Sequence, residues 1–450
     1  MKKVLIITYY WPPSGGSGVQ RWLKFAKYLP EYGWEPVIYT PSNPEANSVD
    51  EALLKDVNPD TTIIKRKILE PYSFYKALIG KEKNKPIKAN IASPVTKKSA
   101  LQRLSLFLRG NFFIPDPRIL WVGPSVRFLK KYLKEHPVDA IVSTGPPHSM
   151  HLIAKRVSKA TGTPWLADFR DPWTEIFYFK HLGLSKWANR RHLSLEQGVL
   201  DTAKGVVVVS KKMQQDFAHR TDTPVEIITN GFDPDDFTTF RTCGLKDGSA
   251  GDGKFHIVHT GLLVDSGNPN TLWEVLGEKV ALDPDFKANL EIRCMGQTDD
   301  SVIEDIQKNG LASNFVNMGY VSHNTAVEWQ LNADVLLLPL RKEPEAAAIL
   351  TGKFFEYLAS QRPILAFGPT DGDLAKALEE TQSGIICDWD QKEAINTAVE
   401  KAYQIYLNNK NKHKEEASLL SCPNNAALKY SRKELTGKLS GLLNDITNNK

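Results

Sequence analysis

Short apolar runs alternate with longer amphipathic stretches along most of the chain. Runs bounded by turn residues predict buried strands, and amphipathic stretches such as residues 19–32 predict helices. The run at 205–209 is nearly all valine, which is typical of a strand buried on both faces. The predicted strands are residues 4–7, 36–39, 139–143, 164–168, 205–209, 255–259, 290–295, 334–338, 363–367 and 384–387. Strands that alternate with helices predict doubly wound parallel sheets.

The alternation is interrupted by residues 230–253, which are rich in glycine, aspartate and threonine and lack periodicity. We therefore expect a linker there, between an N-terminal Rossmann-like domain (residues 1–229) and a second one (residues 254–415). The remaining residues, 416–450, contain a helical pattern that could pack back toward the N-terminal domain. A chain of 450 residues also favours two hydrophobic cores. The predicted fold class is α/β, with two Rossmann-like doubly wound domains that face a cleft.

The net charge of +5 is concentrated in one segment. Residues 76–109 hold nine Lys or Arg and one acid, Glu82, for +8, which leaves 5 − 8 = −3 elsewhere. This segment ends in an amphipathic stretch that could contact anionic membrane; a solvated loop with one packed helix is the alternative. Nucleic acid is not an expected partner, because no aromatics interleave with the basic residues.

The cysteine spacing and the lengths of the apolar stretches indicate the cellular compartment in which the protein works. Cys243, Cys294, Cys387 and Cys422 show no C-x-x-C spacing, and no apolar stretch approaches the length of a membrane span. We expect a reduced cytoplasmic protein, soluble or peripheral at the inner face of the membrane. Three Asp-x-Asp triplets have Pro or Gly at the centre, so they predict turns and helix caps, and no metal is expected.

Residues 351–366 carry the strongest chemical signal. Thr351 and Gly352 can open a helix, so that its first N–H groups, the positive end of its dipole and the Lys353 ammonium could converge on a phosphate. Glu356 lies one turn further along, where a carboxylate can accept from sugar hydroxyls. The spacing predicts a buried face of Phe354, Tyr357 and Leu358 and an exposed face of Lys353, Glu356 and Ser360. An ordinary amphipathic helix with a surface glutamate is the alternative.

The turn after the first predicted strand, PPSGGSGVQR, places Gly15 and Gly16 where backbone N–H groups could approach a ligand. It is a poor dinucleotide fingerprint, because Arg21 stands at the third glycine position. The second strand also lacks a following acid for a cofactor ribose, which argues against a nicotinamide enzyme. A tight strand-to-helix turn without a ligand is the alternative.

Two further strand ends carry ionisable side chains. His148 and His151 begin a predicted helix, where a histidine can donate to a sugar hydroxyl or act as a base; helix capping by Ser149 is the alternative. Asp168 ends the next strand, and Arg170 could neutralise neighbouring carboxylates or a phosphate. An Arg–Asp pair that fixes the loop is the structural alternative here.

Several segments together resemble the retaining GT-B glycosyltransferases, and specifically glycosyltransferase family 4 of the bacterial polysaccharide type. In chain order they are WPPSGGSGVQRWLKFAKYL, VVVVSKKMQQDF, IITNGFDPDDF, HTGLL, NMGYVSHNTAVEWQLNADVLLLPL and GKFFEYLASQRPIL. The resemblance implies hexosyltransferase-like transfer of a sugar from a nucleotide-sugar donor to a hydroxyl of a glycan or lipid-linked acceptor. It also implies retention of anomeric configuration and no metal cofactor. Cell-surface glycan or polysaccharide biosynthesis is the implied setting.

The resemblance also implies roles for particular residues. Gly16 would approach the phosphate of the sugar donor, Lys353 would hold its diphosphate, Glu356 would bind the ribose hydroxyls and Tyr320 would lie near the base. His148 and Asp168 would position the sugars. The expected donor-binding residues are Gly15, Gly16, Gly261, Tyr320, Gly352, Lys353 and Glu356, and the expected catalytic residues are His148, Asp168 and Lys353.

The chain departs from the family pattern at two places. The family often carries two glutamates with seven residues between them; counting back from Glu356, the first would stand at Ala348, and Glu345 lies three residues earlier. The loop after Gly261 reads LLVDSGNPN and lacks the usual Arg and Lys. Phosphate neutralisation would then depend on the helix, its lysine and a contribution from Arg341 or Lys342.

Three other functions fit the same predicted fold. An inverting glycosyltransferase would use His148 or Asp171 as a general base. A nucleotide-sugar epimerase would act without an acceptor. A sugar-nucleotide binding protein that has lost catalysis would agree with Ala348.

Overall fold

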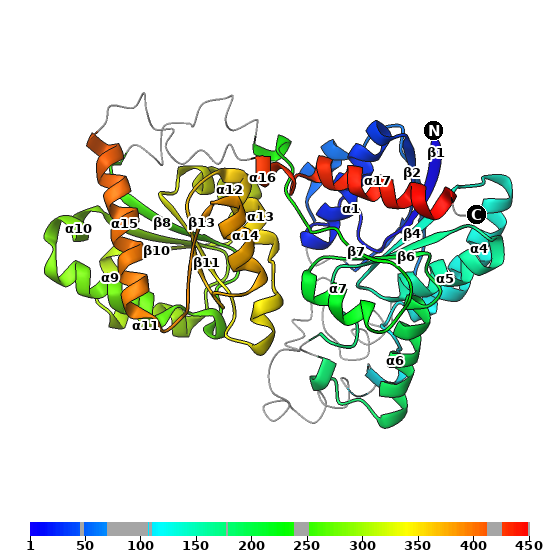
Figure 1. Ribbon diagram of the computed structural model, residues 1–450, viewed down its shortest axis with the longest axis horizontal. Helices are drawn as coiled ribbons and strands as arrows, with labels where there is room; N and C mark the ends of the chain where they lie inside the picture. Colours follow the sequence, from blue (N-terminus) through cyan, green and yellow to red (C-terminus); the bar gives the residue numbers. More distant parts are fainter. Residues whose placement is uncertain are drawn as a thin grey trace. The chain divides into compact units, whose positions relative to one another are not determined.

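The computed structural model describes residues 1–45, 49–69, 107, 110–176, 179–237, 252–411 and 425–448. The chain forms two compact units, one of residues 1–229 and 432–450 and the other of residues 230–431. Each unit is built on one sheet with helices on both faces (Figure 1).

The first sheet has seven strands in the order β3-β2-β1-β4-β5-β6-β7. They are β1 (Lys2–Ile7), β2 (Trp34–Pro41), β3 (Thr62–Arg66), β4 (Ala140–Gly145), β5 (Trp165–Phe169), β6 (Gly205–Val208) and β7 (Val225–Ile227). All neighbours pair in parallel; Val4 of β1, for example, lies opposite Pro36 on one side and Ala140 on the other. The strand order reverses between β1 and β4, where doubly wound sheets bind ligands.

Helices cover both faces of this sheet. Because successive side chains of a strand point to opposite faces, a central strand such as β1 contributes to an apolar cluster on each face. Leu5 and Ile7 pack in one cluster with α4 (Ile119–Glu135), α5 (Ser149–Thr161), α6 (Lys186–Leu200) and α7 (Lys211–Ala218). Val4 and Ile6 pack in the other with α1 (Ser17–Tyr28) and α17 (Arg432–Asn448). The 3-10 turns η1 (Leu29–Tyr32), η2 (Glu51–Asp56) and η4 (Phe179–His181) lie in the described connections.

The last helix, α17, belongs to this first unit although residues 230–431 precede it. Its buried residues Leu435, Leu439 and Leu443 recur every four positions and so form one face. That face packs in the same cluster as the apolar residues of α1.

The second sheet has six parallel strands in the order β10-β9-β8-β11-β12-β13. They are β8 (Phe255–Thr260), β9 (Leu290–Met295), β10 (Phe315–Gly319), β11 (Val335–Pro339), β12 (Ile364–Phe367) and β13 (Gly384–Cys387). Its strand order reverses between β8 and β11, so it has the same switch point as the first sheet.

The helices of the second unit also divide between two faces. Ile257 and Leu337 pack with α9 (Asn270–Leu282), α10 (Pro284–Asn289), α11 (Asp300–Lys308) and α15 (Lys392–Asn411). Val258 and Leu336 pack with α13 (Gly352–Ser360), α14 (Asp373–Thr381) and α16 (Asn425–Leu428), and Trp329 of α12 (His323–Asn332) lies against this cluster. The 3-10 turns are η5 (Asp265–Gly267), η6 (Ala312–Asn314) and η7 (Pro344–Ala348).

The prediction of two doubly wound α/β domains is confirmed, and each apolar run identified in the sequence is a strand. The sequence did not reveal β3, β7 and β10, which all lie at outer edges of the sheets. Edge strands are partly exposed and need no continuous apolar run; β10, for example, has an exposed Asn317 at its centre.

Two predictions concern segments that the structure does not describe in full. Residues 76–106, 108 and 109 of the basic segment lie outside the described residues, as do residues 238–251 of the expected linker. Membrane contact therefore stays a prediction. Among the helices that are described, none is long and apolar enough to cross a membrane.

Candidate functional site

The predicted phosphate-binding helix is α13, and it begins where the sequence indicated. Thr351 is its N-cap, and the Thr351 hydroxyl accepts from the Phe354 N–H at 3.3 Å. The N–H groups of the first turn have no partner inside the helix, so they carry its positive end. The helix follows β11, whose carboxyl end lies at the switch point of the second sheet.

The Lys353 side chain runs over Gly261, at the carboxyl end of β8. A Cβ at Gly261 would lie 2.6 Å from Lys353 Cε and 2.9 Å from Lys353 Nζ, so no larger residue fits without displacing the lysine. Gly261 also has a φ of +104°, which strongly favours glycine. The structure thus brings together three predicted site residues, Gly261, Gly352 and Lys353.

Glycines also lie at the carboxyl ends of the two neighbouring strands, β9 and β10. Gly296 follows β9 with a φ of +118°, and a Cβ there would lie 2.2 Å from the Gly261 carbonyl oxygen. The Gly296 N–H donates to the carbonyl of Gly319, which ends β10. Neither Gly296 nor Gly319 was predicted as a site residue, because isolated glycines give no signal until strand order places them side by side.

Two acceptors hold the Lys353 ammonium. Lys353 Nζ lies 3.4 Å from His259 Nε2 and 3.3 Å from the Leu262 carbonyl oxygen. His259 Nδ1 lies 2.9 Å from the Leu337 carbonyl oxygen, which can only accept, so Nδ1 carries the proton. The lone pair of His259 Nε2 therefore faces Lys353. Sequence reasoning missed His259, since it lies inside an apolar run that reads as a buried strand.

Burial sets the ionisation of this cluster. The pKa of Lys353 is lowered to about 8, mainly by burial; Glu356 and Cys294 oppose the shift, and the Arg341 charge adds to it. Burial and the Lys353 charge lower the pKa of His259 to about 3. The imidazole is therefore neutral near pH 7, and a bound phosphate would stabilise the Lys353 ammonium.

The other predicted residues of this helix divide between its two faces. Phe354, Tyr357 and Leu358 are buried, as predicted, and Glu356 is exposed one turn after Lys353. The prediction that Ser360 is exposed is wrong: it is 3% exposed, and its hydroxyl donates to the Tyr357 carbonyl at 2.7 Å. Ser360 is the last residue of α13, and its hydroxyl bonds back to the helix backbone instead of to water.

Tyr320 directly follows β10 and is 92% exposed. It lies at the carboxyl end of an edge strand, on the same edge of the sheet as the Gly261 turn. Its role beside a nucleobase stays a prediction.

The two departures from the family pattern have clear local structures. Ala348 ends η7, and Glu345 on the same turn is exposed. Lys342 Nζ pairs with Asp390 at 3.2 Å, whereas the charge of Arg341 acts on Lys353. Of the two cations considered for phosphate neutralisation, Arg341 is therefore the one coupled to the candidate site.

The glycine turn of the first unit lies at the corresponding switch point, between β1 and β4. Gly16 is the N-cap of α1 with a φ of +96°, and no atom of the described residues lies within 4 Å of the position of a Cβ. Backbone conformation therefore explains this glycine, and the space beside it is open. Gly15 immediately precedes it.

His148 and His151 lie across this switch point, after β4. The His148 ring stacks on Trp173 with centroids 4.7 Å apart, and His151 Nδ1 lies 2.8 Å from the Ser143 hydroxyl. Within the described residues, His148 Nδ1 and His151 Nε2 have no hydrogen-bond partner. A Cβ at Gly145 would lie 2.9 Å and 2.6 Å from these two atoms. Both nitrogens therefore point toward the backbone at the end of β4.

Burial lowers the pKa of His148 well below its ordinary value and that of His151 to about 3. Both rings are neutral near pH 7, and so weak a base disfavours proton abstraction by His148. The N-terminus of α5 is capped from outside the helix, because the Asp116 carboxylate accepts from the N–H and hydroxyl of Ser149 at 2.8 and 2.9 Å.

Asp168 is 0% exposed, and its carboxylate is fully engaged within the protein. It accepts from Arg21 Nη2 at 2.8 Å and from Trp22 Nε1 and the Thr144 hydroxyl at 2.7 Å each. Burial opposes ionisation, but the Arg21 charge and these hydrogen bonds outweigh it and lower the pKa of Asp168. This geometry argues against direct contact with a sugar. Arg21, not Arg170, is the arginine of the Arg–Asp pair considered from the sequence.

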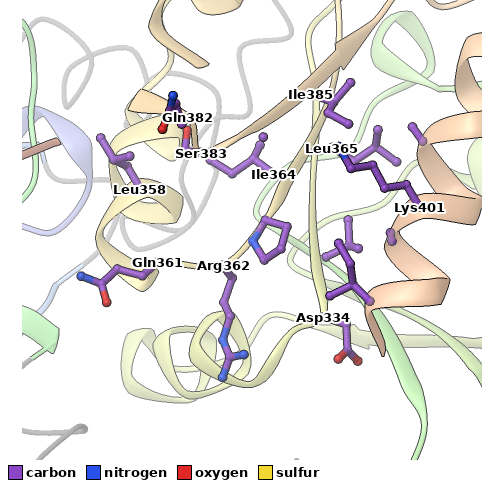
Figure 2. A pocket seen from close by; sticks show the side chains of 16 residues that line it. Asp334, Leu358, Gln361, Arg362, Ile364, Leu365, Gln382, Ser383, Ile385 and Lys401 are labelled. Atoms are coloured by element: carbon purple, nitrogen blue, oxygen red, sulfur yellow. The ribbon is translucent and has the colours of Figure 1, made fainter. Parts of the chain in front are cut away.

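A cavity of about 200 Å³ lies elsewhere in the second unit (Figure 2). Its wall includes the residues that precede β11, β12 and β13, among them Asp334, Arg362 and Ser383. These are the amino ends of the strands, whereas Lys353 and Gly261 lie at carboxyl ends. The cavity is therefore separate from the candidate site.

Comparison with known proteins gives one sequence match and several structural matches. Residues 91–236, less than half of the chain, match the model of Glycosyltransferase Family 4. No curated protein sequence matches the chain.

The structural matches extend over almost the whole chain at low sequence identity. Sucrose-phosphate synthase from Thermosynechococcus elongatus is 12% identical, with 100% of both chains covered and a TM-score of 0.56. The E. coli trehalose-6-phosphate protein bound with UDP-2-fluoro glucose is 12% identical, with 98% and 99% covered and a TM-score of 0.61. S. aureus TarM with Fondaparinux, alpha-GlcNAc-glycerol and UDP is 13% identical, with 99% and 100% covered and a TM-score of 0.52. The chain therefore shares the GT-B fold, and residues 91–236 are similar to glycosyltransferase family 4.

Proposed function

We propose that this protein is a nucleotide-sugar-dependent glycosyltransferase, in which the second unit binds the sugar donor and the first unit binds the acceptor. The position of Lys353 carries the proposal. Its ammonium lies over Gly261, beside the open N-terminus of α13 and at the switch point of a doubly wound sheet. A diphosphate is the ligand that this combination of cation, helix dipole and bare backbone suits.

The remaining donor contacts follow the same arrangement. Glu356 is one turn along α13, where its exposed carboxylate would accept from the ribose hydroxyls. Tyr320 would lie near the base, and Gly15 and Gly16 of the first unit would approach the phosphate. Lys353 and the helix N-terminus supply the positive charge that a metal ion supplies in other transferases, so we propose a metal-independent reaction. Undiminished turnover in excess EDTA is the expected result.

We propose transfer with retention. Charge develops on the departing diphosphate in the transition state, and an ammonium fixed beside it lowers the barrier. The departing phosphate oxygen would take the proton of the acceptor hydroxyl, so no protein base is needed. The lowered pKa values of His148 and His151 agree with this route, since so weak a base is poorly suited to remove a proton. Inversion would appear as the opposite anomer in proton NMR of the product.

The acceptor is proposed to be a glycan or lipid-linked sugar of the cell surface. The structurally similar S. aureus TarM is described with alpha-GlcNAc-glycerol and UDP, and the E. coli protein with UDP-2-fluoro glucose. These ligands support a nucleotide diphosphate as the common part of the sugar donor. Asp168 is proposed to act indirectly, by holding Arg21, whose guanidinium also donates to the carbonyls of Ile228 and Thr229.

A thermal-shift screen of UDP-, GDP- and TDP-sugars tests the proposal, because a ligand that binds the folded state raises Tm according to its affinity and concentration. One of these classes of nucleotide sugar should raise the Tm of the wild type and of Lys342→Ala but not that of Lys353→Ala. Lys342 is a matched control, since it is a lysine of the same unit that pairs with Asp390.

Turnover assays then separate the alternatives. Release of nucleotide only in the presence of an acceptor indicates transfer. Conversion of the sugar donor without any acceptor would indicate an epimerase. Binding without nucleotide release across a broad acceptor panel would indicate a protein that has lost catalysis.

A further inference from the structure

His259 of β8 contacts Lys353 of α13 at the carboxyl end of β8. His259 is 1% exposed, and its Nε2 lies 3.4 Å from Lys353 Nζ. The hydrogen bond from His259 Nδ1 to the Leu337 carbonyl fixes both the tautomer and the direction of the ring. A buried imidazole held in this way presents one lone pair, at Nε2, to the ammonium.

A second residue of α13, Tyr357, bonds to the same strand backbone as His259. The Tyr357 hydroxyl accepts from the Thr260 N–H at 3.0 Å and donates to the Leu337 carbonyl oxygen at 3.4 Å. Tyr357 lies four residues, about one turn, after Lys353 on α13. The Leu337 carbonyl of β11 therefore orients both His259 of β8 and Tyr357 of α13.

We infer that His259 is a positioning residue for the sugar donor: its Nε2 lone pair holds the Lys353 ammonium over Gly261, where the charge meets the diphosphate. This inference rests on the proposed function. A neutral acceptor suits the task, because a carboxylate at the same place would pair with Lys353 and cancel the charge that the diphosphate needs. Residues 262–270 after Gly261 contain no Lys or Arg, so the placement of the Lys353 ammonium matters more here.

The charged and ionisable groups around Lys353 come from several elements. Glu356 lies on its own helix, Cys294 on β9 and Arg341 after β11. With the pKa of His259 at about 3, the imidazole stays neutral and keeps its Nε2 lone pair available throughout the range in which Lys353 titrates. Loss of that acceptor should lower the pKa of Lys353 from about 8.

Two isosteric variants separate the two ring nitrogens. In His259→Asn the amide can still donate to the Leu337 carbonyl, but nothing remains at the position of Nε2. In His259→Gln the longer side chain can place an amide oxygen at that position. We expect His259→Asn to raise the KM for the sugar donor about tenfold, the size of one hydrogen bond to a charged group. The KM for the acceptor should not change, and His259→Gln should recover part of the loss.

A measurement without any sugar donor tests the contact itself. The rate of reductive methylation of Lys353, followed by mass spectrometry across pH 6–10, reports the fraction of neutral amine. The midpoint should move to lower pH in His259→Asn and return toward the wild-type value in His259→Gln. An unchanged midpoint in His259→Asn would overturn the inference, as would equal loss of Tm and of donor affinity in both variants. If labelling shifts as expected while no nucleotide sugar binds the wild type, the proposed function fails and the contact stands.

Discussion

The Lys353 side chain passes so close to Gly261 that a Cβ on the glycine would lie 2.6 Å from Lys353 Cε. Gly261→Ala should therefore displace the ammonium and strain a backbone with a φ of +104°. We expect donor affinity to fall about tenfold or more and Tm to decrease. Calorimetric titration with the stabilising nucleotide sugar measures the first effect. Gly441→Ala in α17 is the control, because no atom of the part of the chain that the structure describes lies within 4 Å of its Cβ position. Unaltered binding by Gly261→Ala would contradict the assignment.

Replacement of the ammonium itself should have the largest kinetic effect. Lys353→Ala removes the charge beside the departing diphosphate, and we expect kcat/KM for the sugar donor to fall about 10²-fold or more, as for other preorganised groups at a developing anion. A nucleotide-release assay with a saturating acceptor provides the measurement. Lys342→Ala should stay within about twofold of the wild type, since that ammonium pairs with Asp390. Equal losses in the two variants would show that general surface charge, rather than this site, supports turnover.

Donor binding should depend on pH through Lys353. Its pKa is about 8 in the protein without ligand, and a bound diphosphate raises it because the charged form is stabilised. Below pH 8 the ammonium is already present and affinity is at its maximum. Above pH 8 each bound donor must take up a proton, so Kd should rise toward tenfold per pH unit. Calorimetry in buffers of different ionisation enthalpy measures the proton uptake that accompanies binding. In Lys353→Arg, whose side chain stays charged, Kd should not change with pH.

The buried pair of Asp168 and Arg21 should stabilise the first unit far more than a surface pair does. Asp168→Asn leaves the Arg21 guanidinium buried without its counter-charge, which costs about 3–5 kcal/mol. Asp216→Asn breaks the exposed pair with Lys212 and should cost less than about 1 kcal/mol. Chemical denaturation followed by tryptophan fluorescence compares them. If Asp168→Asn retains full stability but loses turnover, direct contact with a sugar would be the better explanation.

Local signals explain what the sequence could predict. The start of α13 is set by the Thr351 cap and the residues directly after it, so the helix, its buried face and the exposed Glu356 were visible in one short segment. The central strands were visible because burial on both faces demands continuous apolar runs. Edge strands such as β10 escape this demand.

The features that were missed depend on residues far apart in the chain. Asp168 reads as a free carboxylate at a strand end, yet its partners Arg21 and Trp22 lie 147 and 146 positions earlier. The orientation of His259 depends on the Leu337 carbonyl, 78 positions later. Only the order of strands in each sheet brings these groups together, and no short segment contains that information.

The attachment of α17 to the first unit has a consequence for the order of synthesis. The strands that need the cover of Leu435, Leu439 and Leu443 are made first, and the helix that supplies it is made only after residues 230–431. During translation the apolar residues of β1 and α1 must remain partly open to water until residues 432–448 leave the ribosome. The second unit, continuous in sequence from 230 to 431, can complete its own core earlier. The first unit can therefore complete its core only after the second unit has been synthesised.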